Sequence, residues 1–378
     1  MYAVRNAIDP LSPLMRSAAS TADSLIPLKS LRHGFLEELF LYVSAQSISD
    51  GEVLFEQGTY DGQVIYLRSG TLELEHPSGF IERVSADSAI LPLANQQPRP
   101  CKATAVGDCM MLRMDADRLD RTLSWSQITD YVVTELSMDR EHDGHLDWMT
   151  TVLSSNLFFK VPSVNAEQIF DRLVAVNVKK GDTVIKQGDI GDCCYFLKEG
   201  EADIVKRARE GEAEKVAKIV AGRCFGEDAL VEKKPRNATV VMASDGTLMR
   251  LDKDDFLRLL AEPVVEEITV EELDRREDSP VLIDVRTEAE YRLGHLVLSA
   301  NLPVSILALK KRLMSLEQPY VFYCDTGRRS RAAAYFLGKE GYNVVSLAGG
   351  LHQQNLFDRF VEAPSYILRD GVLATSED

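Results

Sequence analysis

The sequence predicts a multidomain chain in which two β-barrel or jelly-roll domains with flanking helices precede an α/β domain with a parallel sheet. Three observations predict this. The chain has 378 residues, more than one ordinary hydrophobic core contains. Two stretches, 50–74 and 180–204, share one pattern of glycines, and such self-similarity indicates tandem related domains. After residue 263, short apolar strands alternate with helical segments, as in parallel α/β sheets.

The composition excludes several functional classes. A formal net charge of −16 repels nucleic acid, and no basic patch compensates for it. No apolar run is long enough to span a membrane, and the leader, residues 1–21, lacks a signal-peptide core, so we expect a cytoplasmic protein that binds no membrane. The six cysteines form no CxxC pair, which predicts reduced thiols rather than disulfides or a zinc site.

The repeat comprises two copies of a small antiparallel domain. In each copy, short β-branched and aromatic runs alternate with turns at glycine, a pattern typical of a barrel or jelly roll. The glycines taken alone predict turns and no ligand site. The paired positions are Gly51, Gln57, Gly58 and Gly70 in the first copy and Gly181, Gln187, Gly188 and Gly200 in the second.

A helical segment, 118–150, lies between the copies. It ends with a group of polar residues that could suggest a metal site, namely His142, Asp143, His145 and Asp147. No second ligand cluster or fixed turn accompanies them, so we interpret this stretch as a solvated linker and expect no metal and no cofactor.

The second copy contains a candidate phosphate site in RCFGEDALVEKKPRNATVV, residues 223–241. A short helix that begins near Gly226 would point free amides and its positive dipole end at an anion. Arg236 can bind two phosphate oxygens through its forked guanidinium. Glu227 fits such a ligand only if the ligand also offers hydroxyl donors, as a ribose does. The alternative is that Glu227 and Arg236 form an internal surface ion pair.

This segment resembles the phosphate-binding cassette of cyclic nucleotide-binding domains, in which FGE-x-AL is followed by PR-x-AT. The resemblance implies that Glu227 binds the ribose 2′-hydroxyl, that Arg236 binds the exocyclic phosphate oxygens, and that a helix at 253–262 covers the base. It implies a cyclic nucleotide as regulatory ligand, most simply cAMP, and leaves cAMP and cGMP undistinguished. The predicted nucleotide-binding residues are Gly226, Glu227, Asp228, Ala229, Arg236, Asn237 and Ala238.

The first copy lacks this chemistry. Aligned at equal length, its stretch SAILPLANQQPRPCKATA places Leu91 and Pro92 against the Gly-Glu pair and Cys101 against the arginine. Arg99 is close by and could take the place of the arginine, but prolines on both sides disfavour a cassette helix. We expect a degenerate domain without nucleotide.

The third segment is predicted to be the α/β domain. Strands are expected at VLIDVR, PYVFYC and VVSLAG, and helices at TVEELDRR, EAEYRLG and SRAAAYFLGKEG. Cys324 ends the PYVFYC strand, at the carboxyl edge where such sheets bind ligands, and Ser330 is the expected N-cap of the next helix. The loop amides with Arg328 and Arg329 would lower the thiol pKa from about 8.5 to roughly 3.5–7.5, against the charge of Asp325. The alternative is a buried inert thiol.

Residues 268–360 resemble a single-domain rhodanese, the sulfurtransferase fold. The residues that carry this resemblance are Asp284, Val285, Arg286, Glu290, Tyr291, Gly294, His295, Asn301, Leu302, Pro303, Gly349 and Gly350. The resemblance implies that Cys324 becomes a persulfide that carries sulfur from donor to acceptor, and that Arg328 and Arg329 position an anionic donor such as thiosulfate. The predicted loop site is Asp325, Thr326, Gly327, Arg328, Arg329 and Ser330.

The chain departs from the rhodanese pattern at two places, where GHLVLS replaces GHIPGA and Gln354 replaces an aromatic residue. A related phosphatase would need C-x5-R, but residue 330 is serine, so the loop favours sulfur over phosphate. His295 and His352 are expected to be structural or rim residues, because a persulfide mechanism needs a stabilised thiolate rather than a proton shuttle.

These interpretations predict a cyclic-nucleotide-responsive sulfurtransferase, with a protein as one sulfur acceptor and a homodimer left open. The alternative is a non-enzymatic sensor whose rhodanese-like module binds a partner protein. A transcription factor is disfavoured because no helix-turn-helix follows the second copy, and a kinase regulatory subunit because no basic inhibitory segment is found. The expected domains are 22–145, 146–264 and 265–378.

Overall fold

The computed structural model describes residues 24–138, 146–153, 161–207, 213–354, 356 and 359–375. The described residues form two compact units. One contains the described residues 24–127 together with those from Val265 onward, and the other contains the described residues of Ile128–Val264. The predicted leader and the polar group from His142 to His145 lie outside the described residues.

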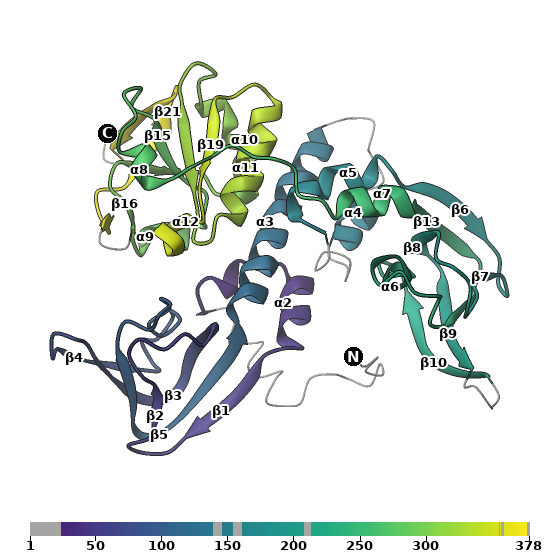
Figure 1. The fold of residues 1–378 in the computed structure, drawn as a ribbon, viewed down its shortest axis with the longest axis horizontal. Helices are drawn as coiled ribbons and strands as arrows, with labels where there is room; N and C mark the ends of the chain where they lie inside the picture. The colour runs from purple at the N-terminus through teal and green to yellow at the C-terminus, as the bar shows by residue number, and fades with distance from the viewer. Residues whose placement is uncertain are drawn as a thin grey trace. The chain divides into compact units, whose positions relative to one another are not determined.

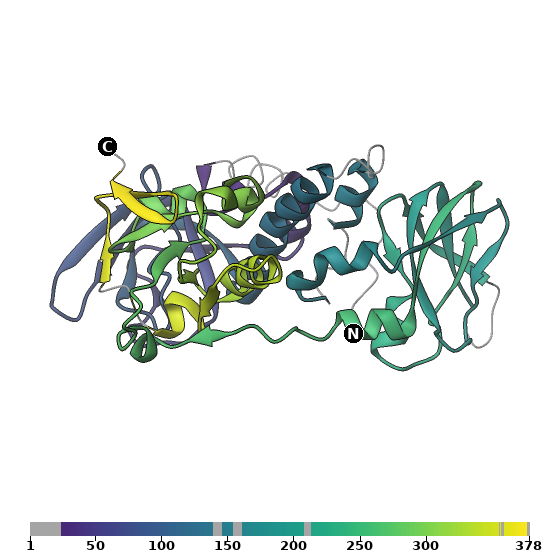
Figure 2. The same cartoon turned by 90° about the horizontal axis from the view of Figure 1, so that it is seen from above.

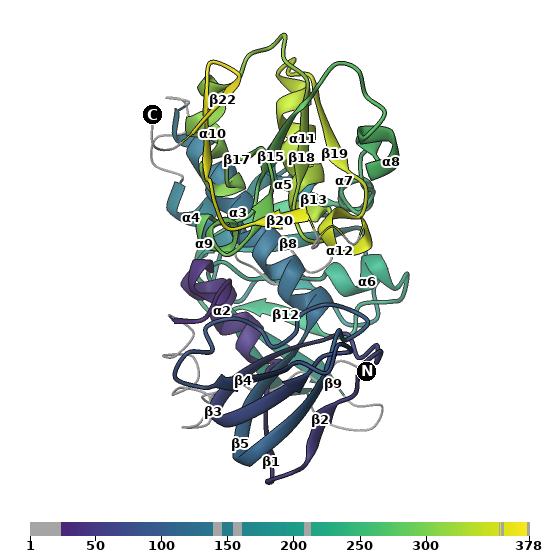
Figure 3. The same cartoon turned by 90° about the vertical axis from the view of Figure 1, so that its left-hand side faces the viewer.

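The first copy is a five-stranded antiparallel sheet with helices at both ends (Figure 3). Its two longest strands, β3 (Gln63–Glu75) and β5 (Lys102–Asp115), pair along most of their length and enclose a core of aliphatic residues. No helix occurs among residues 86–101. The other elements are α2 (His33–Phe40), β1 (Ser44–Ile48), β2 (Val53–Phe55), β4 (Ile81–Ser85) and α3 (Ala116–Met138).

The second copy has two four-stranded antiparallel sheets, in the orders β10-β9-β12-β7 and β11-β8-β13-β6. Its strands are drawn in teal and green in Figure 2. Side chains from both sheets form one core, as in a β-sandwich. The strands are β6 (Val174–Val178), β7 (Thr183–Ile185), β8 (Cys193–Glu199), β9 (Glu201–Arg207), β10 (Ala213–Val220), β11 (Cys224–Phe225), β12 (Thr239–Met242) and β13 (Gly246–Asp252). The helices are α4 (Leu146–Leu153), α5 (Ala166–Phe170), α6 (Glu227–Val231) and α7 (Lys253–Leu259).

The repeated glycines have the same physical role in both copies. Gly70 and Gly200 both have positive φ, at 90° and 97°. A Cβ at Gly70 would lie 2.6 Å from the Asp108 carbonyl oxygen, and one at Gly200 would lie 2.7 Å from that of Asp245. Both the conformation and the close approach therefore require glycine.

The third segment has a seven-stranded sheet in the order β14-β19-β18-β15-β17-β21-β22 (Figure 1). Its pairings are parallel as far as β21 (Tyr366–Arg369), but β22 (Val372–Thr375) pairs antiparallel with β21. The expectation of a wholly parallel sheet is therefore corrected at one edge, because a short turn joins the last two strands. The other strands are β14 (Glu267–Ile268), β15 (Val281–Asp284), β17 (Ser299–Asn301), β18 (Tyr320–Tyr323) and β19 (Val344–Leu347), with β16 (His295–Leu296) and β20 (Phe360–Val361) as a separate pair.

Helices connect the parallel strands of this segment as predicted. α11 (Arg328–Lys339) packs against β18 and β19, and its inward face is rich in alanine, which lets the helix approach the sheet closely. The remaining helices are α8 (Val270–Leu273), α9 (Glu288–Arg292), α10 (Leu307–Lys310) and α12 (Gly350–Gln354). No described helix has the length and apolar character that a membrane crossing requires.

Candidate functional site

The second copy forms the predicted phosphate-binding turn. β11 ends at Phe225, and Gly226 follows with φ 88° as the N-cap of α6. A Cβ at Gly226 would lie 2.8 Å from Nη1 of Arg236, so glycine is required by conformation and by space. Glu227 is the first helical residue and is only 6% exposed.

Arg236 lies against this turn. Its side chain is 5% exposed and donates hydrogen bonds to the Gly226 carbonyl at 2.7 Å and to the Cys193 carbonyl at 2.7 Å. A third contact, to the carboxylate of Asp192, is 3.3 Å long, and Asp192 is 72% exposed. Arg236 is therefore fixed mainly by neutral carbonyls. Its interaction with Asp192 is weak, because exposed carboxylates are well hydrated.

Cys324 follows β18 directly and is fully buried. The main-chain N–H of Gly327 donates a hydrogen bond to the sulfur at 3.2 Å, and the hydroxyl of Ser330 lies 3.6 Å from it. The helix begins earlier than expected: Gly327 with φ 90° is the N-cap of α11, and Ser330 lies inside the first turn, where it donates to the Gly327 carbonyl. The prediction that Ser330 is the N-cap is therefore wrong.

The start of α12, which follows the next strand, closes this loop from the other side. Gly350 has φ 63°, and a Cβ there would lie 2.4 Å from the Cys324 carbonyl oxygen and 2.6 Å from the Gly327 nitrogen. The amide of Leu351 donates to the Cys324 carbonyl, and the amide of His352 to that of Asp325, both at 2.9 Å. The loop therefore has a defined curvature around the sulfur.

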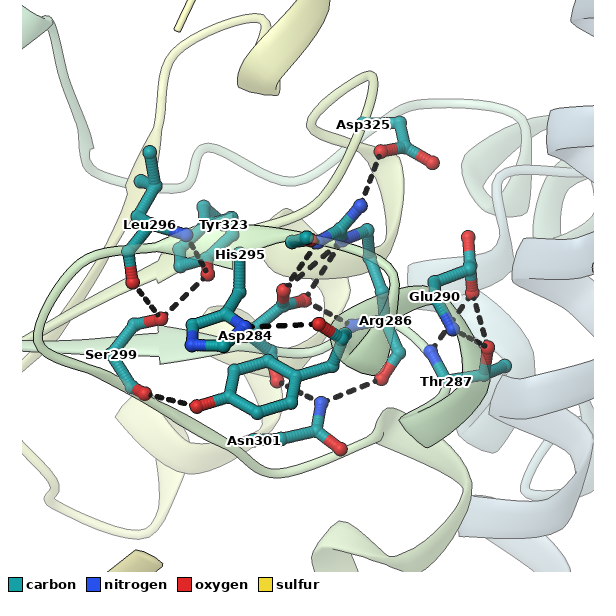
Figure 4. A network of polar contacts seen from close by, with 12 residues as sticks. Asp284, Arg286, Thr287, Glu290, His295, Leu296, Ser299, Asn301, Tyr323 and Asp325 are labelled. Carbon is teal, nitrogen blue, oxygen red and sulfur yellow. Dashed lines mark hydrogen bonds and ion pairs between the residues drawn. The ribbon is translucent and has the colours of Figure 1, made fainter. Parts of the chain in front are cut away.

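A buried polar network supports the loop (Figure 4). Arg286 binds Asp284 through several contacts, the shortest of 2.7 Å, and reaches Asp325 at 3.3 Å. Arg329 is fully buried and binds Glu290 at 2.9 and 3.0 Å and Asp325 at 3.0 Å. Arg329 therefore holds the loop in place through its two Nη atoms. Of the two loop arginines, which the sequence expects to position a donor together, only Arg328 reaches the surface in this conformation.

His295 belongs to the same network and has a structural role. It is fully buried, stacks on Tyr291 with ring centroids 3.8 Å apart, and its Nδ1 lies 3.0 Å from the Tyr291 carbonyl. Its other ring nitrogen lies 3.2 Å from the Pro364 carbonyl. The side chain of Gln354, where the sequence departs from the rhodanese pattern, lies outside the described residues.

The thiol of Cys324 is not activated in this arrangement. Burial raises its pKa, the charge of Arg329 acts in the opposite direction, and the carboxylates of Asp120 and Asp325 raise the pKa further. Asp325 itself stays ionised: burial raises its pKa, but Arg286 and Arg329 outweigh burial and hold it at about 2. The direction is therefore opposite to the expected lowering of the thiol pKa in this conformation, because burial outweighs the charge of Arg329.

Both sites lie in segments that match known protein families. The family described as cyclic nucleotide-binding domain matches residues 45–124 and again 175–262, and the family described as rhodanese-like domain matches 269–354. The chain has two cyclic nucleotide-binding domains followed by a rhodanese-like domain.

Similar proteins include several regulatory subunits. The cAMP-dependent protein kinase regulatory subunit of Yarrowia lipolytica is 26% identical over 294 residues, which cover 69% of this chain and 74% of that protein. The corresponding subunit of Aspergillus niger is 42% identical over 93 residues, 25% of this chain and 22% of that one. The match to the Mucor circinelloides subunit, at 28% identity, covers 61% of this chain and only 52% of that protein. A structure of the regulatory domain of Toxoplasma gondii PKA with cAMP aligns with 66% of this chain and 94% of its own at 19% identity, with a TM-score of 0.29.

In the first cyclic nucleotide-binding domain, Arg99 takes the place of Arg236. The amide of Gly58 donates to the Arg99 carbonyl at 2.9 Å, as the amide of Gly188 does to the Arg236 carbonyl at the same distance. The alignment with Cys101 expected from the sequence is therefore wrong, because the loop of the first domain is shorter than the cassette of the second.

The guanidinium of Arg99 is neutralised from within the domain. Its Nη2 lies 2.8 and 3.0 Å from the carboxylate oxygens of Asp61 and 2.6 Å from the Gln63 carbonyl. Gln63 corresponds to Cys193, so Asp61 corresponds to Gly191. A Cβ at Gly191 would lie 3.4 Å from Cζ of Arg236. Sequence reasoning missed Asp61, although the constant offset between the copies places it opposite Gly191.

The rhodanese-like loop also contacts the first domain through α3. Asp120 accepts hydrogen bonds from the Thr326 hydroxyl and from Arg328 Nη1, both at 2.7 Å, and Asp117 pairs with Arg328 Nη2. Burial raises the pKa of Asp117, but its contacts with Arg328 outweigh burial and the net pKa is lowered. No sequence motif marks these two aspartates.

No group of three or more His, Cys, Asp or Glu residues suited to a metal ion occurs in the described part of the chain.

Proposed function

We propose that the protein is a cyclic-nucleotide-responsive sulfurtransferase, in which the second domain binds cAMP and Cys324 carries sulfur as a persulfide. The observation that carries the proposal is the convergence of Glu227 and Arg236, both buried, on the turn at Gly226. A carboxylate and a guanidinium beside the N-terminus of a helix match a ribose hydroxyl and a cyclic phosphate, respectively. The cassette similarity and the names of the relatives support cAMP.

In the bound state, the residues would divide the ligand between them. Glu227 accepts from the ribose 2′-hydroxyl, Arg236 binds the exocyclic phosphate oxygens, and α7 covers the base. The phosphate would replace the Gly226 carbonyl as the partner of Arg236 Nη1, because a charged acceptor binds a guanidinium more strongly than a carbonyl does. The remaining contacts come from Asp228, Ala229, Asn237 and Ala238.

The sulfur chemistry rests on the loop around Cys324. The thiolate attacks the outer sulfur of thiosulfate, an S–S bond forms to Cys324, and sulfite leaves with the electron pair of the broken S–S bond. A nucleophilic acceptor then attacks the outer persulfide sulfur and releases the Cys324 thiolate. The Gly327 amide stabilises the anionic sulfur in both steps.

A second candidate is a non-enzymatic sensor whose rhodanese-like domain docks a partner protein. The complete burial of Cys324 and its raised pKa favour this alternative. Under either function we propose a cytoplasmic protein with domains at 22–145, 146–264 and 265–378, and protein partners or a homodimer by analogy with the relatives.

Calorimetry with cAMP and cGMP tests the nucleotide site. Arg236→Ala should weaken binding by roughly 10- to 150-fold, because it removes a charge-assisted contact. Arg236→Lys keeps the positive charge but not the forked guanidinium, so its affinity for the nucleotide should lie between those of wild type and Arg236→Ala. Arg207→Ala, at an exposed arginine of the same domain, is the control and should bind as wild type does. Equal affinity of wild type and Arg236→Ala would contradict the proposed site.

Thiosulfate-to-cyanide sulfur transfer tests the enzyme. Wild type should produce thiocyanate and Cys324→Ser should not, whereas Cys101→Ser, at another buried thiol, should retain activity. The assay should be run with and without cAMP. An inactive wild type in both conditions would favour the sensor.

A further inference from the structure

The N-terminal part of α3, the helix that follows the sheet of the first domain, contacts the rhodanese-like loop. Asp117 and Asp120 are three residues apart, so their side chains lie on one face of the helix. Both contact the rhodanese-like loop, more than 200 residues away in sequence. Asp120 is only 9% exposed, whereas Arg328 is 36% exposed. The contact therefore covers the carboxylate more fully than the guanidinium.

The groups that α3 holds are those of the loop that reach the surface. Arg286 and Arg329 are already paired with carboxylates beneath the loop. The Arg328 guanidinium and the Thr326 hydroxyl point instead to Asp120. A carboxylate and an anionic sulfur donor present similar acceptor oxygens to such a pair.

We propose that Asp117 and Asp120 form an acidic lid, an intramolecular substitute for the anionic sulfur donor that occupies Arg328 and Thr326 and blocks Cys324. This inference rests on the proposed function and deepens it, because it assigns the regulation of the same loop. Donor and acidic lid compete for the same two groups, so the loop is closed while the lid is bound.

The electrostatics of the loop agree with inhibition. The acidic lid adds negative charge near Cys324, and the Asp120 carboxylate disfavours the thiolate. α3 belongs to the first domain, in which the carboxylate of Asp61 already pairs with Arg99. The same helix continues to Met138, and the chain leads from there to the second cyclic nucleotide-binding domain.

Alkylation of Cys324 in the full-length protein, followed by peptide mass spectrometry, tests the acidic lid without relying on enzyme turnover. The double variant Asp117→Asn/Asp120→Asn should react with iodoacetate roughly tenfold faster than wild type. Its acceleration with neutral iodoacetamide should be smaller, because the freed Arg328 attracts the anionic reagent. Raised salt should accelerate wild type and leave the double variant unchanged or slower.

The control variant removes the same number of charges from the same domain. Asp87 and Asp108 are exposed, and their substitution by asparagine should leave the reactivity of Cys324 as in wild type. Cys101 and Cys109, buried in the first domain, report loosening of that domain and should stay slow in every variant.

The possible results distinguish failure of the acidic-lid proposal from failure of the proposed sulfurtransferase activity. Unchanged reactivity of Cys324 in the double variant overturns the lid. The lid is also overturned if alkylation becomes equally faster at Cys101, Cys109 and Cys324, in both the double variant and the single variant Asp117→Asn. Such a result would show only that the first domain has become less tightly folded. Faster alkylation of Cys324 alone supports the lid. If the same variant transfers no sulfur from thiosulfate to cyanide, the lid stands and the proposed sulfurtransferase fails.

Discussion

Replacing Asp61 by asparagine tests whether the first domain depends on its internal ion pair. The Arg99 side chain is fully buried, and Asp61 is 23% exposed. The substitution keeps the shape of the side chain and an acceptor oxygen, but it removes the charge that faces the guanidinium. Arg99 keeps its contacts with the carbonyls of Leu93, Ala94 and Gln63.

The expected loss of stability follows from this geometry. Removing one partner of a buried ion pair typically costs about 3–5 kcal/mol, because a charge stays buried without its counterion. The partial exposure of Asp61 and the three remaining carbonyls reduce this value, so we expect a loss of about 2–3 kcal/mol. This corresponds to roughly 30- to 150-fold faster hydrogen exchange of the strands.

Hydrogen exchange of β3 and β5 peptides is the appropriate assay, because several domains preclude a single two-state unfolding curve. Burial raises the pKa of Asp61, but the amide of Gln63 and the charge of Arg99 outweigh burial and lower the net pKa. A lowered pKa in the folded state contributes stability above the unfolded pKa, near about 3.9, and loses it as pH falls through the folded value. The difference between wild type and Asp61→Asn should therefore be full at neutral pH and shrink below about pH 4.

The control is the exposed pair in the same domain between Arg83 and Glu73, which are 70% and 31% exposed. Glu73→Gln should cost less than about 1 kcal/mol. If Asp61→Asn accelerates exchange no more than Glu73→Gln does, Asp61 is not the internal counterion of Arg99 and the reasoning fails.

Three further predictions concern the second domain and the sulfur loop. Gly191→Asp should weaken cAMP binding in calorimetry by at least about tenfold, because it supplies a carboxylate to Arg236. Gly191→Ala is the control, since it adds a side chain without a charge. Equal effects of the two substitutions would contradict this prediction. Gly350→Ala should accelerate hydrogen exchange of the β18 and β19 peptides through a loss of roughly 1–3 kcal/mol. Gly341→Ala, with positive φ but open space, should accelerate it less, and the reverse order would count against the close packing. Because the pKa of Cys324 is raised, its alkylation by iodoacetamide should keep increasing above about pH 8.5, and a plateau below neutral pH would show an activated thiol instead.

Some local features of this chain were predictable from the sequence, because glycine marks positions where the backbone turns and charged residues mark where a helix begins. The turn at Gly226 and the start of α6 follow from FGE and are confirmed, as is the alternation of strands and helices after residue 263. The loop arginines were harder to predict. α11 begins two residues before the expected N-cap, and each residue turns a helix by about 100°, so Arg328 and Arg329 point in different directions and meet different surroundings.

Contacts distant in sequence were not predictable. The equivalence of Arg99 and Arg236 depends on main-chain hydrogen bonds across loops of different length, which no ungapped alignment contains. The contact of Asp120 with Thr326 and Arg328 joins residues more than 200 positions apart, and each looks like an ordinary surface residue in its own segment. Such pairs depend on how domains fold together, and sequence periodicity carries no information about this.

The three arginines suggest where an anion from solution enters. Arg99 binds the carboxylate of Asp61, and Arg328 binds those of Asp117 and Asp120, so both have an acidic partner from the chain itself. An incoming anion must displace these carboxylates, which subtracts their binding free energy from its own. Arg236 instead binds two carbonyls and a solvent-exposed carboxylate, so an incoming phosphate exchanges neutral acceptors for a charged one. The second domain should therefore bind its anion first, and the rhodanese-like loop should bind one only after α3 has moved away from it.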